Sequence, residues 1–137
     1  MRQRISVVKP FRGRTILVVE DHEDSLNVSR LILEAHGARV VCATDGHEAL
    51  RALEIEQPDL ILCDLRMPVM DGYAFIARLR RNPRLARLCV IAVTALGEYS
   101  DLLQTWAAGF DGHLAKPVDD YVIRSPRSVF PVQVRVA

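Results

Sequence analysis

The sequence of 137 residues lacks the features of several special protein classes. No apolar run approaches the roughly 20 residues that a membrane-spanning helix needs, and the basic first residues precede no long apolar stretch of the kind found in secretory signals. Its three cysteines, Cys42, Cys63 and Cys89, are an odd and widely spaced set inside apolar runs, which excludes a CxxC zinc site and a disulfide framework. We therefore expect a cytoplasmic protein that does not contact a membrane.

Aromatic residues are also few, at 6%, but half of the chain is hydrophobic and 26% is charged, which is typical of a globular domain. The net charge of +1 conceals an uneven distribution. Residues 1–14 and 121–137 carry basic groups and no acid, whereas residues 15–120 hold ten basic and seventeen acidic residues, a net of −7. We expect a basic N-terminal extension over 1–14, one domain over 15–120 and an atypical tail over 121–137. The basic ends lack interleaved aromatics, so we expect solvated ends and no nucleic-acid partner, while contact with another anionic partner stays open.

Short apolar segments alternate along the chain with longer segments in which apolar residues recur at helical spacing. The expected strands are Thr15–Glu20, Arg39–Ala43, Asp59–Asp64, Leu88–Val93 and His113–Ala115. The expected helices are Ser25–His36, Gly46–Glu56, Asp71–Arg81 and Gly97–Ala108. This alternation predicts a parallel sheet with helices on both faces. The carboxyl ends of its strands meet at one edge, where ligands bind in open α/β sheets.

The last segment breaks this pattern, because a fifth helix is due after Asp120 and the chain instead reads YVIRSPRSVFPVQVRVA. Pro126 and Pro131 interrupt any long helix there. We expect the fifth helix to be short, missing or replaced by an irregular tail. Apolar sheet surface is then left for the tail or for a second copy to cover, so a homodimer is one of the expected outcomes.

Polar side chains stand at the expected carboxyl ends of four strands: Glu20 and Asp21, Asp64, Thr94 and Lys116. Each one alone is more typical of a helix cap, a turn or a surface charge. Three carboxylates at one edge repel each other and need a cation, and their oxygen donors favour Mg²⁺. One of the carboxylates could then act as a nucleophile toward a phosphoryl group, with the lysine and the threonine contacting its oxygens.

Four segments carry a resemblance to a known family: ILVVEDHEDS, DLILCDLRMPVMDG, VIAVTA and GHLAKPV. From about Thr15 to Asp120 the chain resembles the receiver domain of bacterial two-component response regulators. The resemblance implies a flavodoxin-like (βα)₅ fold with strand order 2-1-3-4-5. It also implies that Asp64 accepts a phosphoryl group from a histidine kinase or phosphotransfer protein, and that the modified domain acts on a downstream protein partner.

The resemblance further implies a role for each residue near Asp64. Glu20, Asp21, Asp64 and the backbone carbonyl of Arg66 would hold Mg²⁺, while Thr94 and Lys116 would contact the phosphoryl group. The family's conformational switch pairs the threonine with an aromatic residue three positions before the lysine. That position is His113 here, so we expect Thr94 and His113 to form the switch. Glu20 stands where aspartate is commoner, which leaves Mg²⁺ binding possible.

Two other interpretations of the chain's function remain open. A Mg²⁺-dependent phosphohydrolase with an aspartyl-phosphate intermediate usually has a second aspartate two residues after the nucleophile, and Arg66 occupies that position. A pseudo-receiver would bind its partner without phosphorylation, which the intact set of Asp64, Thr94 and Lys116 disfavours. We expect a phosphoacceptor that catalyses its own phosphorylation and dephosphorylation, and no enzyme with turnover of a separate substrate.

Overall fold

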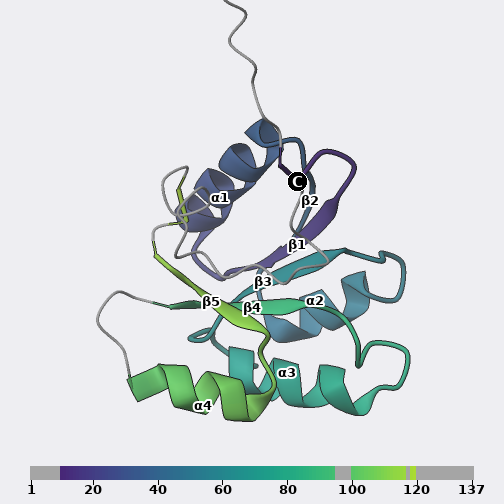
Figure 1. The fold of residues 1–137 in the computed structure, drawn as a ribbon, viewed down its shortest axis with the longest axis vertical. Helices are drawn as coiled ribbons and strands as arrows, with labels where there is room; N and C mark the ends of the chain where they lie inside the picture. Colours follow the sequence, from purple (N-terminus) through teal and green to yellow (C-terminus); the bar gives the residue numbers. More distant parts are fainter. Residues whose placement is uncertain (1–9, 95–99, 117, 120–137) are drawn as a thin grey trace, which may run out of the picture.

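The computed structural model describes residues 10–94, 100–116 and 118–119 of the chain (Figure 1). The described strands are β1 (Thr15–Val19), β2 (Arg39–Ala43), β3 (Leu60–Asp64), β4 (Val90–Thr94) and β5 (Gly112–Ala115). The described helices are α1 (Glu23–Ala35), α2 (Gly46–Ala52), α3 (Gly72–Arg81) and α4 (Ser100–Ala108). All strand pairs are parallel and their order is β2-β1-β3-β4-β5, which confirms the predicted flavodoxin-like topology.

The sheet is buried on both faces because successive side chains of a strand point to opposite sides. Leu17 of β1 and Ile61 of β3 belong to the hydrophobic core under α2 and α3, whereas the neighbouring Ile16 and Leu60 belong to the core under α1. Figure 1 shows this division, with α1 on one side of the sheet and α2, α3 and α4 on the other. Strands that face two cores must be apolar at every position, which explains the continuous apolar runs of the sequence.

The helix boundaries differ from the predictions where a local hydrogen bond decides them. Helix α1 starts at Glu23, not Ser25, because His22 is its N-cap and the His22 Nδ1 accepts a hydrogen bond of 3.3 Å from the Ser25 amide. Helix α2 ends at Ala52, before the predicted Glu56, and tight turns follow it. The other described boundaries lie within two residues of the predictions.

Some predictions fall outside the described residues. These are the start of the last helix at Gly97, most of the basic extension and the whole tail over 121–137, including the predicted replacement of a fifth helix. Within the N-terminal segment, Phe11 is buried in the core under α1 and its amide donates to the carbonyl of His36. None of the helices formed by described residues has the length and apolar character that crossing a membrane requires.

Candidate functional site

The polar residues predicted at the strand ends surround one hollow at the carboxyl edge of the sheet. Glu20 and Asp21 follow β1, Asp64 ends β3, Thr94 ends β4 and Lys116 follows β5. All five line a hollow of about 410 Å³, together with Arg66. Strands β1 and β3 are neighbours although β2 lies between them in the chain, so the hollow sits where the strand order reverses.

Lys116 joins two of the carboxylates. Its Nζ lies 2.6 Å from Oδ2 of Asp64 and 3.3 Å from Oε1 of Glu20. Glu20 and Asp64 are both buried, at 5% and 7% exposure, while the lysine side chain keeps 35% exposure. One ammonium group therefore compensates two buried carboxylates and remains accessible from the hollow.

The backbone after β3 fixes the Asp64 carboxylate. The amide of Arg66 donates to Asp64 Oδ1 over 3.1 Å, and the amide of Gly72 donates to the carbonyl of Leu65 over 3.0 Å. A Cβ atom at Gly72 would lie 2.6 Å from the Asp64 carbonyl oxygen. The first turn of α3 can approach β3 this closely only because glycine stands at its first position.

Burial and neighbouring charges shift the protonation of this cluster. Burial raises the pKa of Glu20 to about 8, assisted by a hydrogen bond with Asp64 and by its negative charge, and opposed by Lys116. Burial would also raise the pKa of Asp64, but hydrogen bonds from Glu20, Lys116 and the Arg66 amide outweigh it and lower that pKa. For Lys116, burial disfavours the charged form, but the hydrogen bond and charge of Asp64 prevail and raise its pKa.

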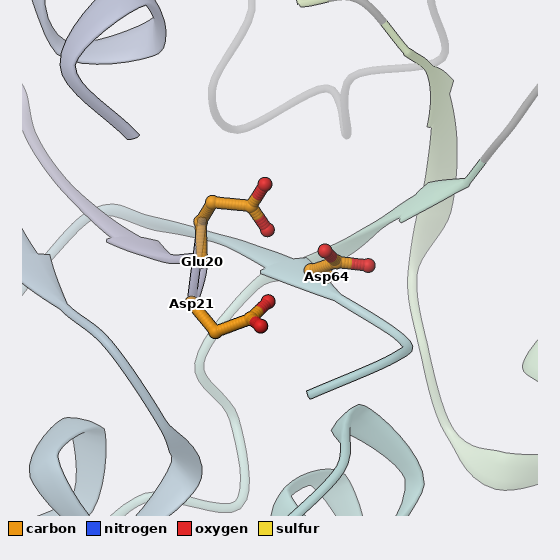
Figure 2. A group of neighbouring side chains, drawn as sticks. All are labelled: Glu20, Asp21 and Asp64. Atoms are coloured by element: carbon orange, nitrogen blue, oxygen red, sulfur yellow. The ribbon is translucent and has the colours of Figure 1, made fainter. Parts of the chain in front are cut away.

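The three carboxylates could hold a divalent cation. One oxygen from each of Glu20, Asp21 and Asp64 lies within 4.8 Å of the others, and Figure 2 shows the two side chains after β1 extending beside Asp64. Glu20 Oε2 is buried and has no hydrogen-bond partner among the residues that the structure describes. A buried acceptor without a donor, next to an exposed Asp21, is an arrangement that a cation would complete. The donors are all hard oxygens, so the residues fit Mg²⁺.

The two predicted switch residues lie in different surroundings. Thr94 is half-buried at the rim of the hollow, and its carbonyl accepts from the Lys116 amide over 2.7 Å. His113 does not line the hollow. Its Nε2 lies 2.7 Å from Oγ1 of the buried Thr105 on α4, and its ring meets Trp106 edge-on at a centroid distance of 5.8 Å. Burial lowers the pKa of His113, so the neutral imidazole is favoured.

Besides the apolar Leu65 and Val93, sequence reasoning missed two polar residues of the hollow, His22 and Ser25. They follow the acidic pair directly, and an N-cap reading of His22 was the only signal that could have placed them there. A second hollow of about 420 Å³ adjoins the first and shares Glu20, Asp64 and Lys116 with it. Apolar side chains from α1 and the strands line it, among them Val28 and Val93.

Comparisons with known proteins show the family and the fold to which this chain is similar. The family model described as the response regulator receiver domain matches residues 16–125. An uncharacterized 14.6 kDa protein of Leptolyngbya boryana is 42% identical over 76% of this chain and 79% of that protein. The DNA-binding dual master transcriptional regulator RpaA of Synechocystis sp. is 39% identical over 76% of this chain, which spans only 43% of that regulator. The solved signal receiver domain of a signal transduction histidine kinase from Syntrophus aciditrophicus is 36% identical, with a TM-score of 0.72 and coverage of 81% of this chain and 84% of that one.

Proposed function

We propose that this chain, which belongs to the response regulator receiver domain family, accepts a phosphoryl group on Asp64 from a histidine kinase or a phosphotransfer protein. The observation that supports this most directly is the contact of 2.6 Å between Lys116 Nζ and Asp64 Oδ2 in a hollow that also contains Glu20, Asp21 and Thr94. Receiver domains are signalling modules, so we propose no turnover of a separate substrate.

The chain's own residues would carry the transfer. A carboxylate oxygen of Asp64 attacks the phosphorus of the donor phosphohistidine, and the bond between phosphorus and imidazole nitrogen breaks as the new bond between phosphorus and oxygen forms. The bonding electron pair leaves with the imidazole. The lowered pKa of Asp64 keeps its carboxylate ionised. Lys116 is positioned to pair with a phosphoryl oxygen, and the Thr94 hydroxyl lines the same hollow.

Receiver domains bind Mg²⁺ at an acidic site, and we assign its ligands here to Glu20, Asp21, Asp64 and the carbonyl of Arg66. When bound, Mg²⁺ supplies positive charge against the phosphoryl oxygens. The Arg66 amide donates to Asp64 Oδ1 and so holds the carboxylate at the edge where its acidic neighbours lie.

Phosphorylation would act on a partner through Thr94 and His113. New charge and acceptor oxygens at Asp64 would attract the Thr94 hydroxyl. His113 contacts Thr105, so a movement of His113 would be passed to α4. We assign this domain to 15–120, the basic extension to 1–14 and the atypical tail to 121–137, with a downstream protein partner or a second copy as the receiver of the signal and a cytoplasmic location.

Intact mass after incubation with Mg²⁺ and acetyl phosphate tests the proposal. The expected result is the gain of one phosphoryl group, absent in Asp64→Asn and retained in Asp24→Asn, which removes an exposed carboxylate on α1. Steady release of phosphate from phosphate esters, without a stable adduct, would instead assign the chain to the phosphohydrolases. No adduct in the unmodified chain, with partner binding independent of Asp64, would make it a pseudo-receiver.

A further inference from the structure

Arginine is concentrated in one segment of this chain, at the end of α3 and in the turn that leads to β4. Residues 72–88 contain five arginines and no acidic residue. Half of the ten basic residues of the otherwise acidic segment 15–120 therefore lie in this short stretch of sequence. Arginine presents a planar fork of donors that matches carboxylates in paired hydrogen bonds, which lysine does not.

Among these arginines, Arg80 makes the contacts that join distant parts of the described structure. Arg80 donates to the carbonyls of Gly109, Ala86 and Leu88 and pairs with Asp111 at 2.8 Å. The four others, Arg78, Arg81, Arg84 and Arg87, are exposed, and none forms an ion pair with another residue that the structure describes. They leave an uncompensated basic surface, which we call the arginine surface.

A hollow of mixed lining lies beside Arg84. Its volume is about 330 Å³, and Arg84 lines it together with the apolar Leu53, Ile55, Leu85 and Leu88. Ile55 is 85% exposed, one of the most exposed large apolar side chains among the described residues. A hollow that places apolar side chains beside an arginine fits a partner that combines one apolar side chain with carboxylates.

Two acidic residues also line this hollow, but they do not cancel the arginine surface. Glu56 is already neutralised by Arg39, with two contacts of 2.8 and 2.9 Å. The single negative charge of Glu54 is then opposed by the positive charges of the four exposed arginines. The remaining acidic charge of segment 15–120 is a reason against a long polyanion such as DNA, which would also contact the rest of the domain.

The arginine surface lies at the edge of the sheet opposite Asp64. Residues 53–57 and 84–88 precede β3 and β4, whereas Asp64 ends β3. A partner bound there does not cover the acidic hollow. We propose that the arginine surface and the hollow beside Arg84 bind an acidic protein segment with a central aromatic or aliphatic anchor, independently of phosphorylation.

Fluorescence anisotropy with a labelled synthetic peptide, in which one phenylalanine is flanked on each side by glutamates, tests this proposal on the full chain. The double variant Arg84→Gln/Arg87→Gln should weaken binding about tenfold. The control Arg12→Gln/Arg30→Gln removes the same charge from the turn before β1 and from α1, and should leave the affinity unchanged. Ile55→Ser should also weaken binding, whereas Leu103→Ser, which alters a side chain 82% exposed on α4, should not.

Equal affinity of the arginine double variant would overturn the proposal, and so would equal affinity of a peptide with glutamine in place of glutamate. Tighter binding of a DNA duplex with the same arginine dependence would assign the surface to nucleic acid and would also overturn it. Asp64→Asn should bind the peptide normally, so a failure of phosphorylation and a failure of peptide binding are separate outcomes.

Discussion

Lys116 and Asp64 lie 52 residues apart in the sequence, and their side chains meet at 2.6 Å. The contact depends on the whole sheet, because Asp64 ends the central strand β3 and Lys116 follows the outer strand β5. Lys116 also reaches Glu20 at the end of β1. The lysine thus links the ends of three strands at the point where the fold places its acidic cluster.

Lys116→Met should destabilise the metal-free chain. It leaves the buried Asp64 carboxylate and the neighbouring Glu20 side chain without their cation, and we expect a loss of about 1–2 kcal/mol in unfolding free energy, less than for a fully buried pair because the lysine is partly exposed. Urea unfolding with and without Mg²⁺ measures the loss. Mg²⁺ should recover part of it, and a loss that is identical with and without the metal would argue against a shared site.

Mg²⁺ should raise the stability of the unmodified chain, because it binds the folded carboxylates and not the unfolded ones. At a concentration of about a hundredfold over its Kd the gain is about 2.7 kcal/mol. Asp21→Asn removes one of the three clustered carboxylates and should shift the Mg²⁺ titration to higher concentration. Asp24→Asn is the matched control. Thermal unfolding across a Mg²⁺ titration gives both values, and equal midpoints for the two variants would count against Asp21 as a ligand.

His113 should make stability fall at mildly acidic pH. Its pKa is lowered in the folded chain by burial, so below the ordinary value of 6.5 the unfolded chain takes up the proton more readily. This part of the stability is complete above pH 6.5 and is lost as the pH falls through the lower folded pKa. Urea unfolding measures this at a series of pH values below 6.5. The unfolding free energy of the wild type should fall with pH, and His113→Phe, which lacks the imidazole, should lack this part of the fall.

His113→Tyr should retain phosphorylation, since the ring at this position stands outside the acidic hollow. Labelling of this variant with acetyl phosphate and Mg²⁺ is the measurement. A variant that folds normally but takes no label would show that the imidazole is needed for the transfer itself.

Gly72→Ala should be costly and Gly46→Ala cheap, although both glycines are the first residue of a helix. The new Cβ at Gly72 would lie 2.6 Å from the Asp64 carbonyl oxygen, which is backbone and cannot move aside. At Gly46 it would meet the flexible end of the Met70 side chain at the same distance. We expect a loss of about 1–3 kcal/mol for Gly72→Ala and under about 1 kcal/mol for Gly46→Ala. Denaturant unfolding of both variants measures these losses. Equal losses of unfolding free energy would refute the argument that the backbone contact at Gly72 is what makes the substitution costly.

The parallel sheet and the acidic hollow could be predicted from the pattern of apolar runs, whereas the strand order was implied by the resemblance to receiver domains. A strand buried on both faces is apolar at every position, so β1, β3 and β4 are visible as continuous runs. Parallel topology then places the residues that follow them at one edge. Glu20, Asp64 and Lys116 are therefore found from their positions after apolar runs, without knowledge of their contacts.

The partners of individual side chains could not be predicted, because they depend on how distant elements pack. The hydrogen bond between His113 and Thr105 joins β5 to α4, and Arg80 ties α3 to Asp111. Nothing in the spacing of these residues marks them as pairs. The five arginines of residues 72–88 are likewise indistinguishable by spacing until the structure shows that Arg80 contacts Gly109 and Asp111.

Strand β5 is the outermost strand on its side of the sheet and pairs only with β4 among the described strands. Outer strands separate from a sheet at lower free energy than central ones. A brief detachment of β5 would withdraw the ammonium group of Lys116 while β1 and β3 stay in place. Hydrogen exchange at the β5 amides would then measure how often Lys116 is separated from the carboxylates. That frequency limits the rate at which the chain can accept a phosphoryl group.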